Sequence, residues 1–433
     1  MSTGTKVQPR LLFADAKGTI YDDPDLLLLC RRGDELALPR PQDLTPLPEG
    51  SDVFLLPGRR AVGMDPETGQ ALALEENAVA AFVCPAHTVT GVAAYATDAG
   101  APRLPLMAYA AVGFAEGRFW VCAKKVDEDR RQVFSGIPQE RIAQGARNLL
   151  VKFPKNRLVA HLGRCALTYC CPAAKNLALG RFEAPLPTAQ ACNARCLGCI
   201  SHQPEDSGFP APQGRIAFRP SPAEVVEVMA EHARRERRCP VYSFGQGCEG
   251  EPLTEARTIA EAVARFRAGG GRGTVNVNTN ASLPEAMEPL ARAGVDSIRV
   301  SMNSADPGLY AAYYRPQGYA GLEAVRQTVE QAKVHGLFVS LNLLFFPGVT
   351  DTEAELDRLA AWCQELRVDF VQLRNLNLDP ELYLELAAPF VSGPSMGLAN
   401  FKKRLKKTCP DLGFGYFNPY LGDRKAPQGP EAP

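Results

Sequence analysis

Three closely spaced cysteines are the residues of this chain best suited to chemistry. Cys192, Cys196 and Cys199 stand in the stretch Cys-Asn-Ala-Arg-Cys-Leu-Gly-Cys, with the spacing CxxxCxxC. Three thiolates from one loop can hold three irons of a [4Fe–4S] cluster, which leaves the fourth iron without a protein ligand. An open iron is what catalysis needs and what a pure electron carrier avoids. The spacing therefore indicates an iron–sulfur site with one reactive corner.

Two other interpretations of the same loop stay open at this point. His202 follows Cys199 after two intervening residues, so a structural zinc site with three cysteines and one histidine could form. The three thiols could also be unligated. The elements around the loop bear on this choice.

Strand-like and helix-like runs alternate over about 190 residues that include the cysteine loop. Six strands alternating with helices predict parallel pairing with right-handed crossovers. Six units of this length favour an incomplete (β/α) barrel over a full eight-unit barrel. An open, doubly wound sheet is the alternative. Strands are expected at 185–191, 241–245, 274–279, 297–302, 337–345 and 370–376, and helices at 222–238, 254–267, 283–293, 322–334 and 351–366.

The cysteine loop and its place after a first strand resemble the radical S-adenosylmethionine (SAM) superfamily. In that family CxxxCxxC follows the first strand of a partial (β/α)6 barrel and binds a [4Fe–4S] cluster. The resemblance implies that Cys192, Cys196 and Cys199 are the metal ligands and that SAM chelates the open iron. It further implies reductive cleavage of SAM to methionine and a 5′-deoxyadenosyl radical, which abstracts hydrogen from a substrate. Gly198 departs from the family, which usually has an aromatic residue there.

A second segment resembles the family's Gly-Gly-Glu-Pro motif. Gly250-Glu251-Pro252 follows the expected second strand. The resemblance implies that Glu251 accepts a charge-assisted hydrogen bond from the SAM amino group. It also implies that Gly250 lets the backbone approach the ligand. A favourable charge at the start of the next helix is a second reading of Glu251.

The third strand ends in a run of alternating asparagines, similar to the family's Thr-Asn-Gly strand end. Alternation places Asn276, Asn278 and Asn280 on one face of the strand. Their carboxamides suit a polar barrel interior, and the resemblance implies that Asn278 contacts the cofactor. A turn-forming role is the alternative, chiefly for Asn280.

The fourth strand and the residues after it resemble the family's pattern of a strand-end serine and a later arginine. Ser301 and Asn303 lie at the strand end, and Arg315 follows a dozen residues later. The resemblance implies that these residues bind SAM, Ser301 by a hydrogen bond and Arg315 through the SAM carboxylate. A surface salt bridge is the alternative for Arg315.

Four further cysteines could hold an auxiliary iron–sulfur cluster, which many members of the family carry. Cys165, Cys170 and Cys171 lie ahead of the expected barrel, and Cys248 lies in the Glu251 loop. Their spacing matches no standard cluster motif. Buried, inert thiols packed on the barrel are the alternative.

The composition of the chain bears on which kinds of partner and which cellular location we expect. The 433 residues carry 48 basic and 48 acidic side chains, so no strong nucleic-acid signal is present. The longest stretch without charged residues, 77–97, lacks the Leu/Ile density of a membrane span. We expect a cytoplasmic protein with reduced thiols. The expected domains are a mostly-β domain with linker at 1–180, the barrel at 184–379, and a short extension at 380–433 with a disordered tail.

The leading hypothesis is thus a radical SAM enzyme of unknown subfamily, substrate and catalytic side chains. Its expected partners are SAM, an electron donor such as flavodoxin or ferredoxin, and an unidentified substrate. The alternative is a zinc- or iron–sulfur-binding module that acts in structure or electron transfer without SAM chemistry.

Overall fold

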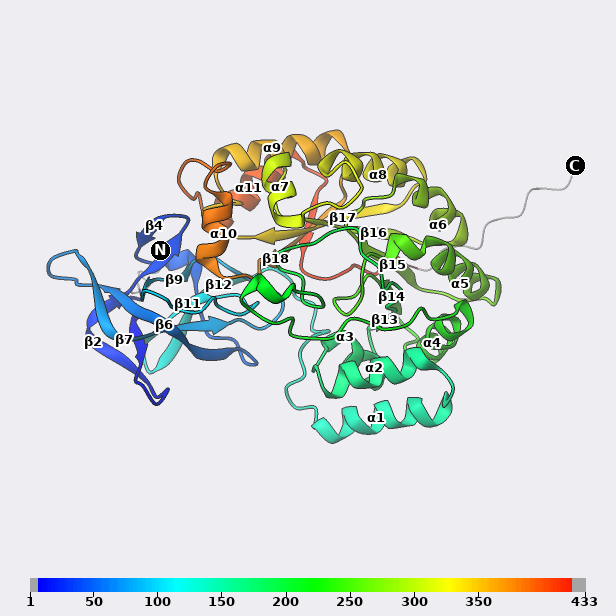
Figure 1. The fold of residues 1–433 in the computed structure, drawn as a ribbon, viewed down its shortest axis with the longest axis horizontal. Helices are drawn as coiled ribbons and strands as arrows, with labels where there is room; N and C mark the ends of the chain where they lie inside the picture. The colour runs from blue at the N-terminus through cyan, green and yellow to red at the C-terminus, as the bar shows by residue number, and fades with distance from the viewer. Residues whose placement is uncertain (1–6, 423–433) are drawn as a thin grey trace, which may run out of the picture.

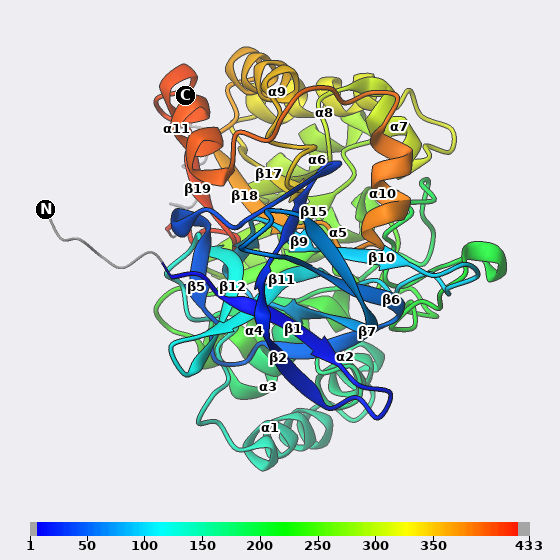
Figure 2. The same ribbon diagram turned by 90° about the vertical axis from the view of Figure 1, so that its left-hand side faces the viewer.

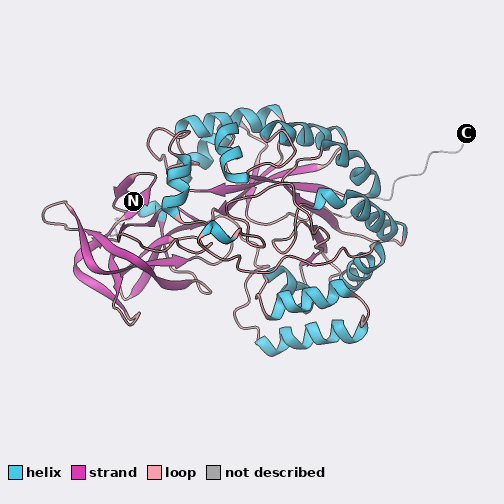
Figure 3. Cartoon of the chain, in the orientation of Figure 1, coloured by secondary structure: helices cyan, strands magenta, loops and turns pink. Residues whose placement is uncertain are grey.

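The computed structural model describes residues 7–422. An antiparallel β region at the N-terminus packs against one side of a larger α/β region (Figures 1 and 3). The tail expected to be disordered lies outside the described residues. Within residues 7–422 no helix combines the length and the apolar character needed to cross a membrane.

Twelve short and long strands make up the N-terminal region, and every pairing among them is antiparallel. Small side chains on β7 and β11 are buried and allow neighbouring elements to pack closely on them. The strands are β1 (Arg10–Ala14), β2 (Ile20–Leu28), β3 (Cys30–Arg32), β4 (Glu35–Ala37), β5 (Leu44–Pro46), β6 (Asp52–Met64), β7 (Ala71–Phe82), β8 (His87–Val89), β9 (Val92–Ala93), β10 (Tyr95–Thr97), β11 (Ala110–Ala115) and β12 (Arg118–Lys125).

Three helices connect this region to the α/β region and lie at the bottom of Figure 1: α1 (Gln139–Lys152), α2 (Arg157–Leu167) and α3 (Pro172–Leu179). The recurrence of Ile142, Ala146 and Leu149 at helical spacing in the sequence predicts the first of them. The Asn156 side chain caps α2 by accepting from the Val159 N–H over 2.9 Å. Proline at the first position and a left-handed Gly180 after the last turn delimit α3.

A curved parallel sheet with helices on its outer side forms the α/β region, a partial TIM-barrel-like fold (Figure 1). Its strands are paired in chain order with no reversal, which a doubly wound sheet would require. The strands are β13 (Glu183–Pro185), β14 (Val241–Phe244), β15 (Thr274–Thr279), β16 (Ser297–Met302), β17 (Phe338–Phe345), β18 (Phe370–Asn375) and β19 (Gly413–Gly415).

Eight helices are described in this region. The strands from β13 to β18 are separated by α4 (Pro222–Arg235), α5 (Ala256–Ala268), α6 (Met287–Ala293), α7 (Pro307–Tyr314), α8 (Leu322–Val334) and α9 (Glu353–Glu365). Two more helices, α10 (Pro380–Ala387) and α11 (Leu398–Thr408), lie between β18 and β19. Short 3₁₀ helices occur at Pro41–Asp43, Glu205–Ser207, Pro252–Glu255 and Pro284–Ala286.

Two details differ from the expected sheet. The first strand covers Glu183–Pro185 instead of 185–191, because the chain leaves the sheet early to form the cysteine loop. A seventh strand, β19, comes from the C-terminal extension and pairs with β18. This strand has only three residues, and two of them are glycine, so the sequence contains no pattern that predicts it.

Polar contacts join the N-terminal region to the sixth strand and the segment after it. The Asn375 side chain donates to the His87 carbonyl oxygen over 3.0 Å and accepts from the Val89 N–H over 2.8 Å. Buried Asp379 accepts from the Leu104 N–H over 2.8 Å and pairs with Arg59. Figure 2 shows the β region lying in front of the α/β region. These contacts place the loop before β11 beside the carboxyl ends of the parallel strands.

Candidate active site

The three cysteines of the loop line a cavity of about 300 Å³ at the carboxyl ends of the parallel strands. The loop is held from the other side by the end of α7. Leu197 N–H donates to the Tyr313 carbonyl oxygen over 3.0 Å, and Arg195 N–H donates to that of Tyr314 over 3.1 Å. The backbone around the cysteines is therefore fixed by a second element, while their side chains border the cavity.

The spacing of these sulfurs does not suit a single ion. Among the described residues, Cys192, Cys196 and Cys199 do not form a group whose ligand atoms all lie within 4.8 Å of one another. His202 is exposed, and its ring nitrogens form no ligand group with these cysteines among residues 7–422, so the Cys3His zinc site is not assembled. The corners of an iron–sulfur cube are occupied by separate irons, whose thiolates lie further apart than those on one ion.

Burial and nearby charges set the ionisation of the loop thiols. Burial raises the pKa of Cys192, and burial together with the other two thiols raises that of Cys196. Arg215 donates to the Cys199 Sγ over 3.6 Å. Thiolates in such a pocket require a neighbouring positive charge, which ligated metal supplies.

The loop after β14 is fastened to the cysteine loop by backbone contacts. Gly250 N–H donates to the Ala189 carbonyl oxygen over 2.7 Å, and Glu251 N–H donates to that of Ala191 over 2.9 Å. A Cβ at Gly250 would overlap the Ala191 carbonyl group. Buried Glu249 accepts from the N–H groups of Thr188, Ala189 and Gln246. Glycine is thus needed here for the approach of two protein loops.

The Glu251 carboxylate lines the cavity and is held from three sides. It accepts from the Asn280 N–H over 2.8 Å, from the Leu253 N–H over 3.0 Å and from the Thr279 hydroxyl. Burial raises its pKa to about 7, although these donors favour the charged form. A carboxylate has about four acceptor positions, so one remains for a ligand. Glu251 also caps the short 3₁₀ helix Pro252–Glu255 that precedes α5, so the second reading, a charge ahead of the next helix, is compatible with its position.

Two further predicted residues, Asn278 and Ser301, line the same cavity. Asn278 is tied into the barrel, donating to the Gly245 carbonyl oxygen over 3.1 Å and accepting from Asn276 over 2.7 Å. The backbone of Asn280 holds Glu251, and its side chain donates to Asn193 over 2.8 Å. The asparagine strand therefore builds the cavity wall and ties it to the cysteine loop.

Three polar atoms around this cavity are buried without a partner in the described part of the chain. They are the Arg299 Nε, the Asn342 Oδ1 and the Tyr314 hydroxyl. Buried polar groups are normally hydrogen-bonded, and exceptions call for an explanation. Three such atoms around one cavity are explained by a polar ligand.

Arg299 is the cationic member of this group. Its Nη1 donates to Gln372 over 3.1 Å, and within residues 7–422 it forms no ion pair. Burial, together with the nearby charge of Arg374, lowers its pKa to about 9. An uncompensated guanidinium in a barrel is costly and is suited to meet an anion.

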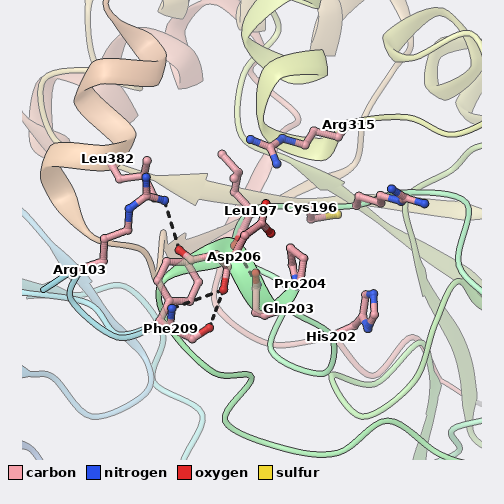
Figure 4. Close-up of a pocket in the computed structure, with 12 residues that line it drawn as sticks. Arg103, Cys196, Leu197, His202, Gln203, Pro204, Asp206, Phe209, Arg315 and Leu382 are labelled. Atoms are coloured by element: carbon pink, nitrogen blue, oxygen red, sulfur yellow. Dashed lines mark hydrogen bonds between the residues drawn. The ribbon is translucent and has the colours of Figure 1, made fainter.

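The structure keeps two predicted residues away from this cavity. Asn303 is fully buried beside Leu309 and Tyr383. Arg315 ends α7 and lines a second cavity of about 490 Å³, which shares Cys196 with the first. Figure 4 shows Arg315 and Arg103 reaching into this second cavity from two sides. Arg315 forms no salt bridge in the described part of the chain.

Gly198, the departure from the family pattern, has a local cause. A Cβ at this position would overlap the Tyr313 hydroxyl. Tyr313 is buried and comes from α7. The aromatic ring beside the third cysteine is therefore contributed by a different element.

Neither Arg299 nor Asn342 was identified as a candidate site residue from the sequence. A pattern of alternating polar residues could have identified them. Ser297, Arg299 and Ser301 alternate with apolar residues along β16, and Asn342 faces Ser301 across the β16–β17 pairing. Polar residues at a period of two on a buried parallel strand indicate an inward, functional face. Asn418, which bonds Gln372, Ser243 and Asn278 inside the barrel, had no such signal because its segment has no regular structure.

Known proteins match the central part of the chain. Residues 186–360 match the model of the radical SAM superfamily. A probable GTP 3',8-cyclase of Thermococcus kodakarensis is 33% identical over 165 residues, which cover 38% of this chain and 48% of the relative. The FeMo cofactor biosynthesis protein NifB of Azotobacter vinelandii is 25% identical over 175 residues, covering 38% of this chain and 34% of the relative. The chain thus spans about half of the first relative's length and about a third of the second's.

Solved structures match with low identity. Streptococcus suis SuiB bound to S-adenosylmethionine has 13% identity and a TM-score of 0.38, covering 62% of this chain and 60% of that one. The maturase HydG of Carboxydothermus hydrogenoformans has 15% identity and a TM-score of 0.35, covering 65% and 76%. The family model and the two relatives agree with each other: residues 186–360 of this chain match the radical SAM superfamily.

Proposed function

We propose that this chain is an enzyme that reductively cleaves SAM and uses the resulting radical to abstract hydrogen from a substrate. The observation that carries the proposal is the joint position of three thiols, a buried carboxylate and unpartnered polar atoms around one cavity. Superfamily members use a [4Fe–4S] cluster and SAM. When bound, the cluster supplies the electron and SAM supplies the radical precursor.

The residues present fit both groups. Cys192, Cys196 and Cys199 offer three thiolates spaced too widely for one ion, as three irons of a cluster require. Glu251 keeps one acceptor position for the SAM amino group. Gly250, Asn278 and Ser301 complete this ligand set. We leave Asn303 and Arg315 out of it, because the cavity does not include them.

We further propose that the substrate presents an anionic group to Arg299. The guanidinium lies across the β15–β16 pairing from Asn278, on the cavity face of the sheet. Arg374 on β18 adds a second positive charge nearby. The name of the relative from Thermococcus kodakarensis points to a nucleotide, and nucleotides carry such a group.

The second cavity suits the approach of an electron donor. Arg103, Arg195 and Arg315 gather there beside Cys196 (Figure 4). Flavodoxin and ferredoxin, the expected donors, would meet this basic surface with acidic groups. Asp206 is an opposing charge in the same wall.

The proposal includes the division of the chain into domains. We assign a mostly-β domain with linker to residues 1–180, a (β/α)6 barrel to 184–379, and an extension to 380–433 that adds β19 to the sheet. Thirteen free cysteines accord with a cytoplasmic location.

Electron paramagnetic resonance of the reduced, reconstituted protein tests the open iron. SAM should change the signal of the reduced cluster in the wild-type chain, and Glu251→Ala should keep the cluster but require more SAM for the change. A cluster signal that SAM leaves untouched would support an electron carrier and contradict the proposal.

A further inference from the structure

A second group of sulfur ligands lies away from the cysteine loop. His161, Cys165 and Cys248 place one ligand atom each within 4.8 Å of the others. It is the one such group of three found among the described residues. Cys165 and Cys248 are 1% and 4% exposed. Neither SAM nor the proposed cluster uses these side chains.

Three segments of the chain build this group. His161 and Cys165 are four residues apart on α2, so both side chains lie on one face of the helix. Cys248 comes from the loop after β14, three residues before Glu251. The carbonyl oxygen of Cys248 accepts from the Ile216 N–H over 2.8 Å, which fixes its backbone. Helix α2 is therefore joined to the loop that carries the Glu251 carboxylate.

The distances are those of a tetrahedral metal site. The His161 Nε2 lies 3.4 Å from the Sγ atoms of both Cys165 and Cys248. Bonds of about 2.3 Å to sulfur and about 2.0 Å to nitrogen at tetrahedral angles give a nitrogen–sulfur separation of about 3.5 Å. Both nitrogen–sulfur distances in this group therefore match the separation expected between two ligands of one tetrahedral ion. Cysteines on separate irons of a cluster would lie further apart.

We propose that His161, Cys165 and Cys248 bind a single tetrahedral metal ion of the zinc type. We assign the fourth position to Cys171, whose sulfur is not within 4.8 Å of all three other ligand atoms and would move toward them when the ion binds. Cys171 packs at the start of α3 against the buried cluster that includes Cys165 and Cys248, and its N–H donates to the Cys165 carbonyl oxygen over 2.9 Å. Structural zinc sites with three thiolates and one imidazole are closed and contribute directly to folding.

The ion would fasten the helical connection to the active-site loop. Helices α2 and α3 would then be bound through Cys248 to the segment that Glu249 and Gly250 fasten to the cysteine loop. This is a structural site distinct from the catalytic cluster. This assignment is an alternative to the auxiliary iron–sulfur cluster expected at Cys165, Cys171 and Cys248, and Cys170, which is exposed, takes no part in it.

Metal analysis of the full chain tests this proposal. Replacing Cys192, Cys196 and Cys199 by Ala together removes the iron–sulfur ligands, so that any remaining metal belongs to the second group. This variant, purified without oxygen, should retain about one zinc per chain. Adding Cys165→Ser should reduce zinc at least about tenfold, and adding Cys170→Ser should leave it unchanged.

Cobalt titration of the chain that lacks Cys192, Cys196 and Cys199 provides a spectroscopic readout of the second group alone. After zinc is removed, one Co²⁺ per chain should give the visible bands of a tetrahedral ion and a thiolate-to-cobalt charge-transfer band. Cys171→Ser should weaken that band by about a third, since one of three thiolates is lost.

Three results would overturn the proposal. They are zinc that is insensitive to Cys165→Ser, a Cys165–Cys248 disulfide in protein kept without oxygen, and iron instead of zinc at this group. None of them bears on SAM cleavage, so this inference and the proposed function fail independently.

Discussion

The molecule contains two groups of cysteines whose geometry differs in a way that separates catalysis from structure. Cys192, Cys196 and Cys199 come from one loop, are widely spaced and border a cavity. Cys165 and Cys248 come from separate elements, lie close to His161 and are buried. A catalytic metal site keeps a position open to ligand, and a structural site is closed. On the proposed assignments, cysteine serves two purposes in this chain, and the spacing and exposure of the thiols distinguish them.

The largest expected effect comes from removing a cysteine of the open group. Cys196→Ala should abolish SAM cleavage, because the cluster loses one of its three ligands. Iron content and deoxyadenosine formation measure the outcome. The matched control is Cys170→Ala, which removes an exposed thiol outside both groups and should keep full activity. If Cys196→Ala and Cys170→Ala cleaved SAM equally well, the proposed catalytic role of the loop cysteines would be contradicted.

Gly250→Ala should break the attachment between the two active-site loops. The added methyl group would overlap the Ala191 carbonyl group, so a loss of about 2–4 kcal/mol in the free energy of unfolding is expected. Urea unfolding measures it. Gly269→Ala at the end of α5 meets only ordinary contacts and should change stability by less than about 1 kcal/mol. An unchanged free energy of unfolding in Gly250→Ala would show that close contact with Ala191 does not hold the two loops together.

SAM affinity should depend on pH through Glu251. Its pKa of about 7 means that the carboxylate is mostly protonated at pH 6 and mostly charged at pH 8. If the charged form binds the SAM amino group, SAM should bind about tenfold more weakly at pH 6 than at pH 8. Calorimetry or fluorescence titration measures this difference. Glu251→Gln should flatten the profile, and a steep profile in that variant would contradict the assignment.

The same raised pKa affects stability with a defined sign. The unfolded chain releases the Glu251 proton near pH 4.3, whereas the folded chain holds it to about pH 7. Glu251 should therefore lower the free energy of unfolding as pH rises between these values, and leave it constant above. Denaturant unfolding of wild type and Glu251→Gln at pH 5 and pH 8 compares the two slopes.

The smallest expected effect concerns Arg299. Arg299→Met removes an uncompensated guanidinium from the barrel, so the substrate-free chain should become about 1 kcal/mol more stable. Substrate-independent SAM cleavage should persist, while binding of an anionic substrate should be lost. Thermal unfolding with and without candidate anions tests both. A destabilised variant would mean that Arg299 is already paired within the protein.

Much of the α/β region could be predicted because its signals are local. The expected helix at 322–334 agrees with α8, and the expected strands at 274–279 and 297–302 agree with β15 and β16. Hydrophobic period and glycine stops mark such elements. The cysteine spacing likewise indicated that three thiols of one loop lie together, and all three line one cavity.

The rest depended on contacts between distant segments. His161 and Cys248 are 87 residues apart, and no spacing rule joins them. The contact of Tyr313 with Gly198 and that of Asn418 with Ser243 also join segments that are distant in the sequence. Sequence patterns describe which face a residue takes on its own element, whereas these pairs arise only from the packing of one element on another.

Deoxyadenosine formation is the measurement that tests the central claim most directly. The wild-type chain, reconstituted with iron and sulfide without oxygen and then reduced with SAM, should produce 5′-deoxyadenosine and contain about four irons. The variant lacking Cys192, Cys196 and Cys199 should produce none and keep its zinc. Iron-loaded wild-type protein that binds SAM without ever releasing 5′-deoxyadenosine or methionine would contradict the account.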